Sequence, residues 1–188
     1  MAGASAEEYE KVNVTQTINL AKKAKESGVN HFIFMSTVKV YDEETDIAYT
    51  ENSDCNPQDD YGKSKLKAEQ ALLGLSDEGL GFRVSIIRTP IVYGYGVKAN
   101  IKNLVNLINK VPVLPFGKIT NNRSMVFVGN LCHLIDEIII RPVGSALGVQ
   151  DKAGIFLACD DEPLSTAKLC ELISVHLDKN ISDKNTIF

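Results

Sequence analysis

A tyrosine and a lysine stand four residues apart in the segment Tyr61-Gly-Lys-Ser-Lys65, at the start of a predicted helix. Residues four apart lie on one helix face, so the Lys65 ammonium can lie near the Tyr61 phenol and lower its pKa from about 10. A phenol tuned in this way can act as a general acid or base. A solvated helix face has the same spacing, so the pair alone does not decide between the two interpretations.

Two hydroxyl groups at the end of a predicted strand favour the chemical interpretation. Ser36 and Thr37 close the apolar run that begins at His31, and such a run is typical of a buried parallel strand. Ligands bind at the carboxyl ends of strands in open α/β sheets. Because the Tyr61 helix begins one loop later, the sequence predicts a ligand site at this edge of the sheet.

Two glycine motifs resemble nucleotide-binding loops only in part. The segment at 62–64, Gly-Lys-Ser, looks like the end of a phosphate-binding loop, but Pro57 stands where that loop needs its first glycine. The segment at 94–99 fits a loose dinucleotide pattern, yet Pro90 interrupts the preceding strand. No acidic residue follows about 20 positions later to hold a ribose. We therefore expect neither segment to bind a nucleotide.

The histidines and cysteines predict ordinary structural positions. The three histidines stand too far apart for a local ligand motif, which predicts no metal site: His31, His133 and His176. The cysteines form no Cys-x-x-Cys pair, and all but the first lie in apolar stretches: Cys55, Cys132, Cys159 and Cys170. These last three are expected to be reduced, buried thiols, which fits an intracellular compartment.

Hydrophobic periodicity predicts an α/β fold. Helices are expected over 6–27, 59–75, 101–110, 131–141 and 166–177, and strands over 31–37, 82–88, 124–128 and 155–159. Residues 41–57 read as a long polar loop and residues 111–117 as an extended, proline-broken segment. Alternating helices and strands with crossover-length connections favour a parallel sheet with flanking helices.

Composition narrows the possible partners. The 188 residues, 44% hydrophobic and 23% charged, suffice for one globular domain with a core. A net charge of −4 with scattered lysines and arginines gives no footprint for nucleic acid or an anionic membrane, which favours a small-molecule partner. The start of the chain lacks a basic, apolar leader, and no apolar run reaches the roughly 18 residues of a membrane span. A soluble, cytoplasmic protein is expected.

Five segments in sequence order resemble the extended short-chain dehydrogenase/reductase family, also called the NAD-dependent epimerase/dehydratase family. They cover nearly the whole chain, which is more specific than any single motif. The segments are Val12-Asn-Val-Thr-Gln-Thr-Ile-Asn-Leu, Phe32-Ile-Phe-Met-Ser-Thr-Val-Lys-Val-Tyr, Tyr61-Gly-Lys-Ser-Lys-Leu-Lys-Ala-Glu, Arg88-Thr-Pro-Ile-Val-Tyr-Gly-Tyr-Gly and Asn121-Asn-Arg-Ser-Met-Val-Phe-Val-Gly-Asn.

The resemblance implies a role for each matching residue. Thr37 would bond the substrate oxygen and Tyr61 would be the acid/base, so their hydroxyls should approach each other. Lys65 would lower the pKa of Tyr61 and hold the nicotinamide ribose, with Ser36 and Tyr61 also at the cofactor. Arg123 would meet the diphosphate of a nucleotide sugar, and Asn100 would lie in the same pocket.

The chain also departs from the family pattern. The family opens with a strand, a G-x-x-G-x-x-G turn and a helix that hold the dinucleotide pyrophosphate, and nothing here corresponds to them. The resemblance implies a fragment: a partial Rossmann-like sheet lacking the first strands, plus a small C-terminal substrate-binding part. Residues 1–95 would be half of an NAD-binding domain, and 96–188 mainly substrate-binding, with a late strand and helix returning to the core. NAD binding by this chain is expected to be weak or absent.

The segments Ser-Thr-Val-Lys-Val and Gly-Val-Lys-Ala-Asn most resemble UDP-glucose or UDP-N-acetylhexosamine 4-epimerases and related 4-ketosugar reductases. The 4,6-dehydratases of the family carry Asp-Glu after the threonine, where this chain has Val38-Lys39, which argues against a dehydratase. Ile91 replaces an asparagine of many members. The resemblance thus implies an NAD-dependent nucleotide-sugar epimerase, with a reductase or a non-catalytic sugar-nucleotide-binding remnant as alternatives. It also implies a homodimer through helices near 6–27 and 59–75.

Overall fold

The computed structural model describes residues 4–76, 81–96, 99–111, 119, 121–140 and 154–177. The chain divides into two compact units. The first comprises Met1–Pro90 with His133–Ala158, and the second Ile91–Cys132 with Cys159–Phe188. No helix in the described ranges is long and apolar enough to span a membrane. Each unit is considered by itself below.

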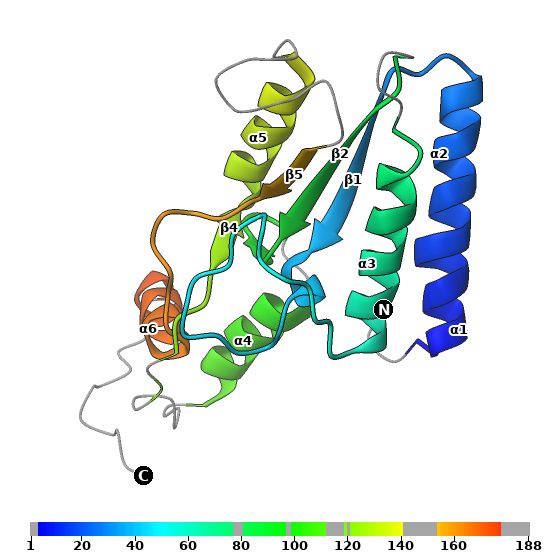
Figure 1. Cartoon of the computed structure of the whole chain (residues 1–188). Helices are drawn as coiled ribbons and strands as arrows, with labels where there is room; N and C mark the ends of the chain where they lie inside the picture. The colour runs from blue at the N-terminus through cyan, green and yellow to red at the C-terminus, as the bar shows by residue number, and fades with distance from the viewer. Residues whose placement is uncertain are drawn as a thin grey trace. The chain divides into compact units, whose positions relative to one another are not determined.

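The first unit is built on a parallel sheet. Strands β1 (His31–Thr37), β2 (Arg83–Thr89) and β5 (Gly154–Leu157) lie in the order β1-β2-β5, as Figure 1 shows. Residue Thr37 pairs with Thr89, so β1 and β2 end at the same edge of the sheet. The Thr89 hydroxyl donates to the Ser36 carbonyl at 3.0 Å and ties these two strand ends together. The predicted parallel α/β sheet is therefore confirmed.

Two helical layers lie beside β1 and β2 in Figure 1. The predicted helix over 6–27 is one continuous rod made of α1 (Ala6–Tyr9), a π-helical stretch (Glu10–Gln16) and α2 (Thr17–Glu26). The second layer is α3 (Asp60–Leu73), which begins where the sequence predicts and packs against β1 and the rod. The periodicity did not indicate the π-helical stretch, because wide turns and α-turns place apolar residues at similar steps.

An apolar core joins α3 and α2 to the sheet. Two alanines and a leucine of the helices pack against larger apolar residues in and next to the strands, and the members are Ala21, Phe34, Ala68, Leu72, Phe82, Val84 and Ile86. The Asp59 side chain accepts a hydrogen bond from the Gly62 N–H at 2.7 Å and thereby caps the first turn of α3. The cap and the apolar contacts fix where α3 begins and which of its faces meets β1.

A buried ion pair crosses this core. Arg88 on β2 and Glu69 on α3 are almost inaccessible, and the Arg88 Nη2 and Nε atoms donate to the Glu69 carboxylate at 2.6 and 3.2 Å. The Ser36 hydroxyl donates to the same carboxylate. Arg88 Nη1 donates to the Tyr41 hydroxyl at 2.7 Å, which donates in turn to the Thr50 carbonyl at 2.9 Å. Each strong donor and acceptor of the network therefore has a partner.

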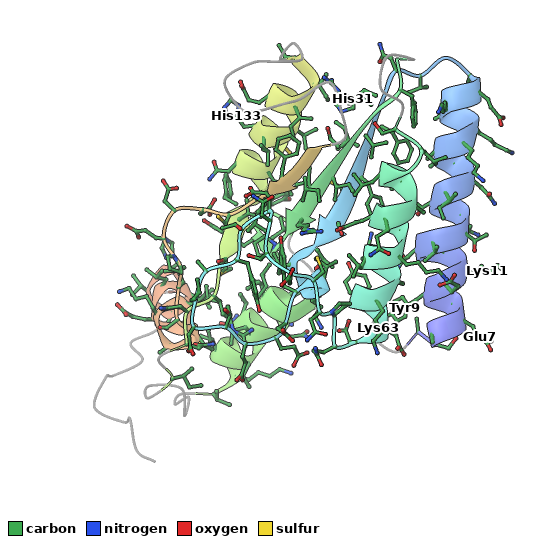
Figure 2. The ribbon with its side chains drawn as sticks, in the orientation of Figure 1. Glu7, Tyr9, Lys11, His31, Lys63 and His133 are labelled. Atoms are coloured by element: carbon green, nitrogen blue, oxygen red, sulfur yellow. The ribbon has the colours of Figure 1, made fainter. Side chains whose placement is uncertain are left out.

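His31 occupies the opposite end of β1 from Thr37 and is labelled in Figure 2. Its Nε2 meets the Ser85 hydroxyl at 2.9 Å and its Nδ1 accepts from Arg83 at 2.8 Å. Burial and the Arg83 charge lower the pKa of His31 to about 4. A neutral histidine in this strand agrees with the structural position that the sequence predicts.

The second unit contains a smaller parallel pairing that the sequence did not predict in full. Strand β3 (Ile91–Tyr93), which the sequence analysis missed, pairs with β4 (Met125–Phe127). The helices α4 (Ala99–Lys110) and α6 (Thr166–His176) contact each other, and both were predicted. Helix α5 (Val128–Ile140) starts immediately after β4, so Val128 belongs to this helix and not to the strand predicted over 124–128. The sequence boundary between the two units falls within α5.

The prediction of buried thiols is right for Cys170 and wrong for Cys132 and Cys159. Cys132 follows the buried Leu131 on α5, and successive residues of a helix point in directions about 100° apart, so the neighbour's burial does not extend to the thiol. None of the four cysteines forms a disulfide bond.

The ion pair of Glu69 with Arg88 predicts a large stability effect. We expect Glu69→Gln to lower the free energy of unfolding by about 3 to 5 kcal/mol, because it leaves the Arg88 guanidinium buried without a counter-charge. The matched control is Lys67→Met. Lys67 lies on α3, as Glu69 does, and its exposed ion pair with Glu10 of the rod should contribute about 1 kcal/mol or less. Urea denaturation measures both values, and equal losses in the two variants would contradict the prediction.

Candidate active site

The hydroxyls of Thr37 and Tyr61 meet at the carboxyl end of β1. Thr37 is the last residue of the strand and is buried, and Tyr61 lies in the first turn of α3. The Thr37 side chain lies close enough to act on the Tyr61 hydroxyl and to favour a lower pKa of Tyr61. The arrangement is the one expected for two groups that must reach a single substrate oxygen.

A short 3-10 turn, η2 (Val38–Val40), connects this end of β1 with the rest of the site. The Lys39 N–H donates to the Thr37 Oγ1 at 3.3 Å, which orients the hydroxyl. The backbone of the turn lies directly against α3: a Cβ atom on Gly62 would stand 2.3 Å from the Lys39 carbonyl oxygen. Glycine is therefore required at position 62 by the close approach of two backbones.

The surroundings of Tyr61 raise its pKa. Burial is the main cause, and the neighbouring Tyr9 and Asp59 act in the same direction, while Lys39 and the Thr37 side chain oppose them. The Tyr9 ring packs at an angle against the Tyr61 ring, with 5.7 Å between centroids. Tyr9 lies at the end of the rod near Lys63 of α3 (Figure 2). The expected lowering of the pKa of Tyr61 is thus wrong for this structure, because burial outweighs the nearby positive charge.

Lys65 points toward β1. Its ammonium donates to the Met35 carbonyl at 2.8 Å and lies 4.4 Å from the centroid of the Phe34 ring. Burial lowers the pKa of Lys65, and the Glu69 carboxylate one turn later opposes that effect. Among the charges that act on Tyr61, the cation that lowers its pKa is Lys39. The helix spacing placed Tyr61 and Lys65 on one face but did not fix the direction of a side chain with four rotatable bonds.

Ser36, the cofactor-binding candidate that lies on β1, is buried inside the protein. Its hydroxyl is buried and donates to Glu69, so it supports the network behind the site. Sequence reasoning missed Glu69 and Arg88. Opposite charges within an apolar helix face and an apolar strand could have indicated them, since a fully buried charge needs a partner.

The second unit carries the two remaining candidates. Arg123 has an exposed side chain, and its backbone forms a two-way bridge with Leu164, with both N–H···O distances at 3.0 Å. Asn100 lies in the first turn of α4, and its side chain is outside the described part of the structure. Sequence analysis also missed Asp160, whose carboxylate accepts from the Tyr93 hydroxyl at 2.8 Å and the Phe127 N–H at 3.0 Å.

Two polar groups at this end of β1 have the chemistry that a ribose requires. The Tyr61 hydroxyl and the Lys65 ammonium are suited to the hydroxyls of a ribose. The glycine turn at 94–96 is not an open phosphate cradle, since a Cβ on Gly94 would lie 2.5 Å from Val128 Cγ1. Within the described residues, no group of three or more His, Cys, Asp or Glu side chains could hold a metal ion.

Comparison with known proteins gives consistent matches. The model of the NAD dependent epimerase/dehydratase family matches residues 2–146. A UDP-glucose 4-epimerase of Vibrio cholerae is 42% identical over 174 residues, which is 91% of this chain and 51% of that protein. An N-acetyl-alpha-D-glucosaminyl-diphospho-ditrans,octacis-undecaprenol 4-epimerase of Escherichia coli O157:H7 is 34% identical over 128 residues, covering 68% and 38% of the two chains.

Solved structures show the same fold. A dTDP-glucose 4,6-dehydratase of Bacillus anthracis in complex with NAD superposes with a TM-score of 0.76 at 21% identity, covering 98% of this chain and 57% of that one. The expected Rossmann-like fold is therefore confirmed. The chain spans about half the length of the curated relatives that it matches.

The close approach at Gly62 gives a test of the site's architecture. We expect Gly62→Ala to lower the free energy of unfolding by about 1 to 3 kcal/mol, the usual cost of overpacking, because the new methyl group must push η2 away from α3. The control is Gly74→Ala at the end of the same helix, where the nearest atom would be 3.5 Å away, and no loss of stability is expected. Thermal or urea denaturation compares them, and a Gly62→Ala protein as stable as Gly74→Ala would refute the close approach.

Proposed function

This chain belongs to the NAD dependent epimerase/dehydratase family, and we propose that it carries the acid–base residues of an NAD-dependent nucleotide-sugar 4-epimerase. The observation that supports the proposal most is the placement of Tyr61, in the first turn of α3, beside Thr37 at the carboxyl end of β1, where Thr37 acts on the pKa of Tyr61. The identity of 42% with a UDP-glucose 4-epimerase favours a UDP-hexose as the substrate.

In the proposed reaction the sugar C4 oxygen lies between the two hydroxyls. NAD held at this site would supply the hydride chemistry at C4, with the hydride removed from one face of the sugar and returned to the other. Thr37 bonds the C4 oxygen and holds it in place. Tyr61 accepts the C4 hydroxyl proton as the carbonyl forms and gives the proton back as the hydride returns, so charge and atoms balance over the cycle.

The raised pKa of Tyr61 defines what the site still needs for this reaction. A neutral phenol can return a proton to the sugar oxygen, but accepting one requires the phenolate. In the proposal, Lys39 favours the phenolate, and Lys65, which its contact with the Met35 carbonyl keeps at the strand end, holds the nicotinamide ribose. Ser36 contributes to this cofactor side through the strand end that it fixes.

The other parts of the chain take the nucleotide side. We assign the diphosphate to Arg123 and a supporting polar contact to Asn100, with residues 1–95 as the cofactor part and 96–188 as mainly the substrate part. The part of the chain described here offers no glycine-rich cradle for a pyrophosphate, so weak NAD binding by the chain alone stays our prediction. The homodimer through 6–27 and 59–75 and the cytoplasmic location also stay predictions.

The acid–base role of Tyr61 can be tested in a chimera. The chain is joined to the part of the Vibrio cholerae relative that it does not match, and conversion of UDP-glucose to UDP-galactose is followed. We expect turnover in the chimera, and a loss of about 10² to 10⁴-fold on Tyr61→Phe with the fold intact, the usual range for a positioned proton-transfer group. Near-unchanged turnover in Tyr61→Phe would remove Tyr61 from this role.

The other outcomes of this experiment separate the alternatives. Reduction of a 4-keto sugar nucleotide without epimerisation would replace the epimerase by a reductase. A chimera that binds UDP-glucose and NAD but converts neither UDP-glucose nor the 4-keto sugar nucleotide would favour a non-catalytic binding remnant. The epimerase proposal would then be withdrawn.

The role of Arg123 predicts a binding effect that can be measured on the chain itself. We expect Arg123→Ala to weaken the binding of UDP by about 1.5 to 3 kcal/mol, the net value of a charge-assisted hydrogen bond. The control is Lys168→Ala, which removes an exposed cation of the same unit that is already paired with Glu171. Titration calorimetry with UDP compares the proteins, and equal affinity of wild type and Arg123→Ala would contradict the assignment.

A further inference from the structure

Lys39 and Asp59 form an ion pair beside the reacting hydroxyls, and neither residue belongs to the acid–base pair itself. Lys39 lies in η2, two residues after Thr37, and Asp59 is the capping residue of α3, two residues before Tyr61. The ion pair therefore connects the backbone segments that carry Thr37 and Tyr61. Its position at the junction of these two segments is the first observation on which the inference rests.

Each partner also makes a second contact at the site. The Lys39 N–H donates to Thr37 Oγ1, and the Asp59 carboxylate accepts from the Gly62 N–H. The side-chain pair thus joins η2 to the start of α3. The backbones of the same two segments also approach each other closely, at Gly62 and the Lys39 carbonyl. Two contacts, the Lys39–Asp59 ion pair and the close approach at Gly62, hold η2 against the start of α3.

The exposure of the pair shows that folding stability is not its main effect. The side chains of Lys39 and Asp59 are 52% and 38% exposed, and ion pairs at such positions contribute little to folding. A pair of this kind can still orient nearby groups and set the local charge. Removing it should leave the chain folded, which makes its local effect measurable.

We propose that Lys39 and Asp59 act as a latch: positioning residues that hold the Thr37 hydroxyl against Tyr61 and balance the charge beside the Tyr61 hydroxyl. The inference rests on the proposed acid–base role of Tyr61 and deepens it by naming the residues that control this group. Lys39 favours the phenolate of Tyr61 and Asp59 opposes it, so the two charges of the latch act on the Tyr61 hydroxyl in opposite directions.

The groups that face Tyr61 come from three directions. Tyr9 packs on its ring from α1, Thr37 acts on it from β1, and the latch flanks it at η2 and the start of α3. The charge on Lys65, in the same helix, is directed to the Met35 carbonyl. Asp59 itself is tuned by the latch: partial burial raises its pKa, but the hydrogen bonds from Lys39 and the Gly62 N–H outweigh it and bring the pKa below the ordinary value.

The latch predicts that removing Lys39 and removing Asp59 change the pKa of Tyr61 in opposite directions. The 188-residue chain is labelled with ¹³Cζ-tyrosine, Tyr61 is assigned with Tyr61→Phe, and its ionisation is followed by NMR. We expect Lys39→Met to move the Tyr61 midpoint upward and Asp59→Asn to move it downward, each by about 0.5 pH unit, as for a charge several ångströms away near the surface. Lys39→Arg keeps the charge and should restore the wild-type midpoint. The control Lys67→Met, which breaks the exposed pair with Glu10, should change nothing at Tyr61.

A second measurement at pH 7 does not depend on the alkaline range. The NMR signals of Thr37 and Tyr61 should shift in Lys39→Met and Asp59→Asn and stay in place in Lys67→Met. Midpoints that move in the same direction in Lys39→Met and Asp59→Asn, or signals that move no more than in Lys67→Met, would overturn the latch. Because neither substrate nor NAD is present, an inactive chimera would refute the proposed function without touching this result.

Discussion

The ion pair between Arg88 and Glu69 is the interaction on which the arrangement of the site depends. A charged pair removed from water is stable only when its geometry is tight and its remaining donors and acceptors are satisfied. Here Ser36 and Tyr41 meet that condition, so the pair fixes the distance between α3, β2 and the end of β1 at once. Desolvation by burial lowers the pKa of Arg88, but the hydrogen bonds to Glu69 and Tyr41 outweigh it and raise the pKa. The buried guanidinium therefore keeps its positive charge. Tyr61 and Lys65 lie on the helix that Glu69 anchors, so their approach to Thr37 follows from a contact deeper in the core.

The same division between interior and surface explains the two kinds of charge around Tyr61. The buried network behind Ser36 is rigid because any unpaired member would cost several kcal/mol. The exposed latch of Lys39 and Asp59 costs little to rearrange, and it lies next in sequence to the segments that carry Thr37 and Tyr61. Placing the adjustable charges at the surface and the fixed ones in the core lets the site respond to a ligand without loosening α3. The raised pKa of Tyr61 records that balance: burial sets the baseline, and the nearby charges modify it.

Local pattern predicted most of the fold, because each long element carries its own signal. The strand at 31–37 and the helix from Asp60 agree with the structure since an apolar run and a capping residue mark them directly. Strand β3 was missed because three residues after Pro90 carry too short a pattern, and its pairing with β4 depends on residues more than 30 positions away. At the site, spacing placed Tyr61, Lys65 and Thr37 on one end of the sheet. It did not show the directions of Lys65, the burial of Ser36, or the roles of Glu69, Arg88 and Lys39, because these depend on contacts between segments distant in sequence.

Lys65 shows how far the geometry goes toward the proposed chemistry. An ammonium has three N–H donors, and among the described residues the structure gives one of them to the Met35 carbonyl. That carbonyl belongs to β1, two residues before Thr37, so the contact anchors the ammonium at the strand end where the hydroxyls of Thr37 and Tyr61 meet. The Phe34 ring beneath it supplies an additional attraction for the cation without using a donor. Lys65 can therefore keep its contact with β1 while two N–H donors are left for the ribose hydroxyls that our proposal assigns to it.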